Sequence, residues 1–143
     1  MTNAELTELL GGWKGFEIQA IERHDASETQ SGRNEVVITL AACSGFAPTC
    51  SACGQKRLTV HDTESRRVRE LPVFDADCWL LIPRRRVACP DCGAKVEELS
   101  WLGRYARVTA RLAESVAKLC RLLPGKQVAE YYHLARSTVK AID

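Results

Sequence analysis

The stretch that decides the fold begins with CSACG at residues 50–54 and ends with CPDCG at residues 89–93. Each motif separates two cysteines by two residues and follows them at once with a glycine. This spacing lets a tight turn aim both sulfurs at one ion, and glycine supplies the unusual backbone angles that such a turn needs. The motifs predict one structural zinc ion in a closed tetrahedral site whose ligands are Cys50, Cys53, Cys89 and Cys92.

The other uses of the seven cysteines fit the sequence less well. An odd number of cysteines without a secretion signal argues against a disulfide framework. A thioredoxin-like redox site normally has one CxxC pair opening a helix, whereas this chain has two pairs in turns. We expect Cys43, Cys78 and Cys120, which lie in apolar sequence, to be buried thiols rather than ligands. Iron also binds tetrahedral sulfur sites, so the choice of zinc over iron stays open.

The sequence around the two motifs predicts β structure. Residues 16–23 alternate apolar and polar side chains, as a half-buried strand does, and residues 36–40 are rich in β-branched residues. Three more strands are predicted between the motifs, at residues 57–61, 67–71 and 78–82. With a short helix at residues 3–10, residues 1–99 are expected to form a small antiparallel zinc-ribbon-like domain with the cysteine motifs at strand ends.

After the second motif the apolar pattern becomes helical. Apolar residues recur every three or four positions from Val108 to Leu123, which is one face of an α-helix that ends at Pro124-Gly125. Two shorter helices are predicted at residues 126–132 and 136–142. Residues 100–143 are therefore expected to form a long helix followed by a helix-turn-helix, and the fold class is α+β.

The two short helices have the apolar residues of a helix-turn-helix. Its small core would consist of Val128, Ala129, Leu134, Val139 and Ile142. The outward positions of the last helix are Arg136, Ser137 and Lys140, with Thr138 near its start. Such side chains reach base edges and phosphates when the helix enters a major groove. The alternative is a helical hairpin used only for packing.

The distribution of charge favours nucleic-acid contacts by the helical segment. Residues 100–143 carry eight basic and three acidic side chains, whereas residues 1–99 carry 12 basic and 15 acidic ones. A basic segment on a nearly neutral body is typical of a phosphate-binding element, although a solvated basic helix face has the same composition. The candidate DNA-contacting residues are Arg84, Arg85, Arg86, Arg104, Arg107, Arg111, Lys126, Arg136, Ser137, Thr138 and Lys140.

The order of these features resembles the N-terminal region of the IS-L-three family of insertion-sequence transposases. That family has a CxxCG motif, a histidine, a basic segment, a strand ending in arginines, a second CxxCG motif, a long helix and a helix-turn-helix. The corresponding residues here are 50–54, 61–62, 67–72, 80–86, 89–93, 107–112, 128–129 and 137–142. The resemblance covers roughly residues 5–143. It implies sequence-specific binding of double-stranded DNA at the terminal inverted repeats of a mobile element.

The resemblance also implies what the chain does not do. In the family a carboxylate-triad nuclease domain of RNase H type follows the helix-turn-helix, and no three acidic residues here suit a two-metal site. We therefore expect a DNA-binding part that is not an enzyme and has no small-molecule substrate; a homodimer would form through the parent protein. Residues 1–12 lack the basic and apolar regions of a secretion signal, so we expect no leader, and the sequence shows no apolar run of about 20 residues. We expect a bacterial cytoplasmic location at the nucleoid and no membrane partner.

Two positions depart from the usual helix-turn-helix pattern, and two other functions stay open. His133 and Ala135 stand where a turn glycine and a capping Ser, Thr or Asn are usual, and the missing cap costs about 1 kcal/mol. One alternative is a zinc-ribbon module for protein interaction or transcription regulation, for which DNA affinity would show no salt dependence. The other is a thiol enzyme using Cys50 or Cys89, in which one CxxC pair would react fast with alkylating agents.

Overall fold

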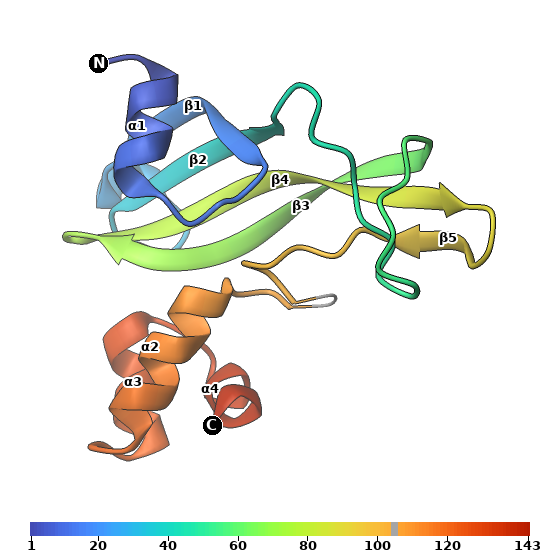
Figure 1. Cartoon of the computed structure of the whole chain (residues 1–143). Helices are drawn as coiled ribbons and strands as arrows, with labels where there is room; N and C mark the ends of the chain where they lie inside the picture. The colour runs from blue at the N-terminus through green and yellow to red at the C-terminus, as the bar shows by residue number, and fades with distance from the viewer. Residues whose placement is uncertain (104–105) are drawn as a thin grey trace.

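The computed structural model describes residues 1–103 and 106–143 and contains a five-stranded sheet (Figure 1). Its strands are β1 (Phe16–His24), β2 (Glu35–Ala42), β3 (Val60–Val73), β4 (Ala76–Cys89) and β5 (Gly93–Val96). The strand order is β1-β2-β4-β3, and β5 pairs with the end of β4. The α+β class is confirmed, but the sheet is mixed rather than wholly antiparallel, because β2 and β4 run parallel.

The position of β4 in the sheet follows from its sequence. Cys78, Leu80 and Ile82 of β4 are almost fully buried, which suits an inner strand. Residues 61–65 at the start of β3 are polar and exposed, so that strand fits an edge. The segment between β2 and β3 lets β4, rather than the polar strand β3, lie beside β2.

The three strands predicted between the cysteine motifs are two long strands in the structure. The polar run at residues 62–66 reads as a break between strands, but it continues β3 and pairs with residues 82–86 of β4. Opposite charges make this pairing favourable, since Asp62 lies across from Arg86 and Glu64 from Arg84. The two strands therefore extend together toward the cysteine motifs (Figure 1).

The sheet has its own apolar core, which also includes residues that precede β1 and residues that follow β5. Helix α1 (Asn3–Leu10) begins at Thr2, whose side chain accepts a hydrogen bond from the Glu5 amide, and it packs on β1. Trp13, Phe16 and Trp101 are buried with the strand residues, and the rings of Phe16 and Trp101 meet edge to face at 5.5 Å. None of the four motif cysteines belongs to this core.

Three helices form the second unit and gather beside β3 (Figure 1). They are α2 (Ala110–Cys120), α3 (Gly125–Tyr132) and α4 (Arg136–Ile142). Helix α2 is shorter than predicted because Thr109 caps its start, accepting a hydrogen bond from the Leu112 amide, and Arg121 ends it. The predicted helix-turn-helix core is confirmed, as Val128, Ala129 and Val139 are buried with Leu134 and Ile142 packed on them. None of the helices in the described residues is long and apolar enough to cross a membrane.

The helices are fastened to the sheet through two neighbouring residues of β3. Arg69 exchanges backbone hydrogen bonds with Arg107 and Thr109, both 2.9 Å long, and its buried guanidinium donates to the carbonyls of Tyr132 and His133. The buried carboxylate of Glu70 accepts a hydrogen bond from the Thr109 hydroxyl. The predicted division between residues 99 and 100 stays a prediction, and the sheet core itself extends to Leu102.

Candidate metal centre and nucleic-acid interface

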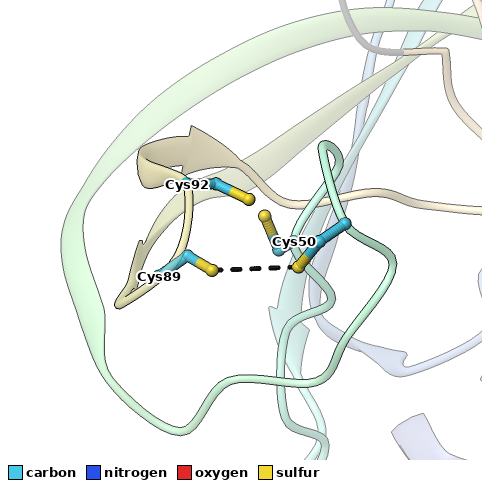
Figure 2. Close-up of side chains that lie close together, drawn as sticks. Cys50, Cys89 and Cys92 are labelled. Atoms are coloured by element: carbon cyan, nitrogen blue, oxygen red, sulfur yellow. Dashed lines mark hydrogen bonds between the residues drawn. The ribbon is translucent and has the colours of Figure 1, made fainter.

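The two cysteine motifs meet at the end of the sheet that lies away from the helices (Figure 1). Cys50 and Cys53 belong to the turn between β2 and β3, Cys89 ends β4, and Cys92 lies in the turn before β5. All four sulfur atoms lie within 4.8 Å of one another. Figure 2 shows the sulfurs of Cys50, Cys89 and Cys92 turned toward a common centre. Two segments 35 residues apart in sequence therefore build one sulfur cluster.

Each motif is a tight turn of the kind that its glycine predicts. The Gly54 amide donates to the Cys50 carbonyl at 2.9 Å, which closes the first turn. Gly54 has a φ of 75° and Gly93 a φ of 81°, and both angles lie in the left-handed region that side chains disfavour. Both glycines leave open space where a Cβ would be, so the backbone angle alone explains the residue.

The spacing of the sulfur atoms fits a tetrahedral metal ion. The Sγ atoms of Cys53 and Cys89 are 3.8 Å apart. With a zinc–sulfur bond of about 2.3 Å, the edge of a tetrahedral site is about 3.8 Å long. Four sulfurs at this spacing leave no ligand position open, which is the arrangement of a structural rather than a catalytic zinc site.

The surroundings of the cluster shift the pKa values of its thiols in opposite directions. Burial works against ionisation of the Cys89 thiol, but the backbone amides of Asp91 and Cys92, together with Arg57, outweigh it and lower the pKa of Cys89 to about 6. Burial and the neighbouring sulfurs raise the pKa of Cys92 to about 12. The four thiols therefore do not all ionise on their own at neutral pH. A bound dication supplies the charge that lets all four act as thiolates.

Two arginines that support the metal centre were not predicted from the sequence. One guanidinium nitrogen of Arg57 donates both to the Cys53 sulfur, at 3.8 Å, and to the Asp91 carboxylate, at 3.0 Å. Such N–H donors hold thiolate ligands in place. Arg85 makes two hydrogen bonds, at 3.0 and 2.8 Å, with the fully buried carboxylate of Glu97 beside Cys50. The position of Arg57, four residues after Cys53, could have indicated its contact with that cysteine. The contact of Arg85 with Glu97 could be predicted only from the register of the strands.

The remaining cysteines lie apart from the cluster. Cys78 is buried in the sheet core, where desolvation raises the pKa of its thiol to about 12. Cys43 and Cys120 are half-buried rather than fully buried as predicted. Within the described residues, the cluster of potential metal ligands consists of the four motif cysteines.

The helix-turn-helix presents the face of α4 that the sequence predicts. Arg136, Ser137 and Lys140 are exposed, Thr138 is half-buried, and Val139 faces the core. The turn between α3 and α4 places His133 in the left-handed conformation, with a φ of 55°. Its ring compensates by bonding to the sheet, because Nδ1 lies 2.8 Å from a carboxylate oxygen of Asp77 on β4. Helix α4 is thereby fixed relative to the sheet.

The structure separates the other predicted DNA contacts into two groups. Arg107 and Lys126 are exposed near the helices. Arg84 is buried, Arg85 is held by Glu97, Arg86 pairs with Asp62, and Arg111 pairs with Glu70 at 3.0 Å while lying over the Trp13 ring. Arg104 lies outside the described residues. Pairing and burial argue against Arg84 and Arg85 as phosphate contacts, since both side chains are committed to the sheet.

Comparison with known proteins agrees with both parts of the site. Residues 47–92 match the zinc-finger of transposase IS204/IS1001/IS1096/IS1165, and residues 97–143 match the helix-turn-helix domain of transposase family ISL3. The chain is 37% identical over 144 residues to the transposase for insertion sequence element IS1001 from Bordetella parapertussis. That match covers all of this chain but 34% of the relative. No solved structure matches the chain.

The two family matches follow one another in the order expected from the sequence. The zinc-finger match and the sulfur cluster together indicate one structural zinc ion. The resemblance stated from the cysteine motifs and the helical pattern is thus confirmed. The chain belongs to the ISL3 family of transposases and contains the zinc-finger and helix-turn-helix regions of that family.

Proposed function

We propose that this chain binds double-stranded DNA sequence-specifically, at the terminal inverted repeats of a mobile element, as the target-recognising part of a transposase. The observation that carries the proposal is the exposed polar face of α4 on a helix-turn-helix that matches the family. The relative is itself named as a transposase of an insertion sequence. In this proposal the chain acts at the bacterial nucleoid and contributes binding rather than catalysis.

The zinc site has a structural role in this proposal. Cys50, Cys53, Cys89 and Cys92 are its four ligands, and the ion holds the end of the β3–β4 ribbon against the turn after β2. Its chemistry is limited to this cross-link, since four sulfurs fill the coordination shell. Arg57 holds Cys53 in place by its contact with that sulfur.

Helix α4 reads the bases in this proposal. Arg136 is the first residue of α4, and the N-terminal residues of a recognition helix are those that reach base edges in the major groove. A guanidinium at this place can bond two acceptors of one guanine. Ser137, Thr138 and Lys140 make shorter contacts with bases or phosphates, and Lys126 and Arg107 contact the backbone on either side.

The decisive experiment selects a duplex target from a random library and compares variants on it. Arg136→Ala should lower the preference for the selected site over unrelated duplex by about 5- to 150-fold, which corresponds to the 1–3 kcal/mol of one specific base contact. Lys118→Ala is the matched control, because Lys118 is an exposed basic side chain on α2 that pairs with Glu114 and is not among the predicted DNA contacts. A zinc-loaded wild-type chain that binds duplex without salt dependence, or not at all, would instead support a protein-interaction module.

A further inference from the structure

A groove of about 570 Å³ lies between the sheet and the start of α4. Five of its lining side chains are arginines, namely Arg33, Arg66, Arg67, Arg69 and Arg107. On the helical side it is lined by Ala135 and Thr138, which flank the exposed residues Arg136 and Ser137. No acidic residue is among the lining residues in the described part of the chain. The groove therefore gathers positive charge directly beside the proposed recognition helix.

Two of the five arginines hold the fold together. Arg69 is buried and bonds to the carbonyls of Tyr132 and His133, and Arg66 donates to the Ala106 carbonyl at 2.9 Å. These contacts fix the walls of the groove. They bring the strand β3, the segment before α2 and the turn before α4 into one rigid arrangement.

The other three arginines face solvent. The Arg67 side chain is 51% exposed, and its guanidinium carbon lies over the Trp79 ring, 3.8 Å from the ring centre. Its ion pair with Glu35 is long, at 3.8 Å. Arg33 is 41% exposed and pairs with Asp77, and Arg107 is exposed. Stacking on Trp79 restricts the Arg67 guanidinium while leaving its N–H edge available, which lowers the entropy lost when it binds an anion.

We propose that this arginine groove binds the phosphate backbone of the DNA duplex next to the bases read by α4. The inference rests on the proposed function and adds a second contact surface, contributed by the sheet and the segment before α2. Arginine forks suit phosphate oxygens, and a row of them along a groove follows a backbone that carries a charge at every nucleotide.

The course of the positive charge supports a duplex as the occupant. A second groove has the basic side chains of Arg33, Lys126 and Arg136 and the single acidic side chain of Glu130 in its lining, and it shares Arg33, His133 and Leu134 with the first. Basic side chains therefore continue from Arg107 and Arg67 through Arg33 to the first residue of α4. Of the DNA contacts predicted at Arg84–Arg86, Arg84 is buried and Arg85 is held by the buried Glu97, so we assign backbone contacts to this strip instead.

The test compares Arg67→Ala, Arg107→Ala and the double variant with wild type by fluorescence anisotropy on a short duplex of mixed sequence. Backbone contacts do not depend on sequence, so this probe is sufficient. The double variant should bind on the order of tenfold more weakly at low salt, and the slope of log affinity against log salt should fall by about one for each arginine removed. Its preference for a selected site should stay unchanged.

Two matched variants make the result specific. Arg23→Ala removes an exposed arginine of the same sheet that neither lines the groove nor belongs to the candidate DNA contacts, and it should bind within about twofold of wild type, as a surface charge outside the contact does. Arg67→Lys with Arg107→Lys keeps the charge and should restore most of the salt slope. Thermal unfolding of each variant shows that the fold is intact.

Several outcomes would overturn the inference. One is a double variant with wild-type affinity and slope, and another is an equal loss in Arg23→Ala, which would show a general charge effect. Competition by polyglutamate that is stronger than competition by duplex would assign the groove to an acidic protein partner. If Arg136→Ala alone loses binding, the proposed function stands without the groove. If wild type binds no duplex, the proposed function itself fails.

Discussion

The zinc end and the helical end of this molecule are each stabilised by a different interaction. At the zinc end, the buried apolar cluster consists of Cys50, Val87 and Cys89, and two of these three residues are motif cysteines. At the helical end, seven buried residues from Val108 to Val139 form a core of ordinary apolar packing. One end depends on an ion and the other on the removal of apolar surface from water.

The stability of each end therefore has its own source, and a third core lies between the two ends. The sheet between the two ends has a core of its own, with Trp13, Ile38 and Leu80 among its buried members. Because neither end contributes residues to the core of the other, we expect the two ends to lose their structure independently. The predictions that follow test this separation.

Removal of zinc should produce the largest effect, confined to one end. Structural zinc sites of this type contribute roughly 10–16 kcal/mol of apparent binding energy, and the four cysteines have few apolar neighbours to replace it. We expect a strong chelator, or the variant Cys92→Ser, to abolish hydrogen-exchange protection of the amides of Cys50, Gly54 and Glu97. The amides of α2 should keep their protection.

The control for this experiment is the zinc-loaded chain treated with the same chelator saturated with zinc. Simultaneous loss of protection at the Val116 and Val128 amides would contradict the comparison, because it would show that the ion holds the whole molecule together. Retention of protection at Cys50 without metal would show that the β3–β4 ribbon orders the cysteine turns by itself.

The next largest effect should come from Glu70, which joins the helical end to the sheet. Its buried carboxylate accepts hydrogen bonds from the Trp13 indole at 2.9 Å and the Thr109 hydroxyl at 2.8 Å, and it pairs with Arg111. Glu70→Ala leaves these donors without their acceptor, so unfolding in urea should show a loss of about 3–5 kcal/mol.

The exposed Glu64 on the same strand is the matched control for Glu70. Glu64→Ala should change the unfolding free energy by no more than about 0.5 kcal/mol. Equal effects of the two substitutions would show that the buried hydrogen bonds of Glu70 do not stabilise the contact between the helices and the sheet. Zinc content should be unchanged in both variants, since Glu70 is not part of the sulfur cluster.

The sequence predicted those features whose signal is local. The cysteine motifs specify their own turns, and the helix-turn-helix core follows from apolar residues a few positions apart, such as Val128 and Val139. Helix α1 and the strands β1 and β2 also lie where alternation and β-branched residues place them. In each case the residues that form the structure are close in sequence.

The features that were missed depend on residues far apart in sequence. The parallel pairing of β2 with β4 was missed because it is decided by which strand is apolar enough to lie inside the sheet. The arginine groove was missed because Arg33, Arg67 and Arg107 come from three segments that meet only in the folded chain. A run such as Arg84–Arg86 looks basic in sequence, but its charges are taken up by Glu97 and Asp62 across the strands.

The smallest effect, and a stabilising one, is expected at the start of α4. Thr109 caps α2 by accepting a hydrogen bond from the Leu112 amide, whereas Ala135, the residue before α4, has no side-chain oxygen and the Thr138 amide bonds only its carbonyl, at 3.0 Å. The backbone at Ala135, with φ −64° and ψ 143°, already has the extended conformation of a capping residue. Ala135→Ser should therefore add about 1 kcal/mol of stability.

Thermal unfolding measures this gain, which should raise the midpoint by a few degrees for a chain of this size. The matched control is Ala141→Ser, an exposed alanine near the other end of α4, where a hydroxyl has no free amide to cap and the midpoint should not rise. Because the helical end is fixed to the sheet by Arg69 and Glu70, a cap on α4 can stabilise that end without altering zinc affinity. An unchanged midpoint in Ala135→Ser would mean that docking on the sheet already holds the first turn of α4, so that α4 depends on Arg69 and His133 rather than on its own capping.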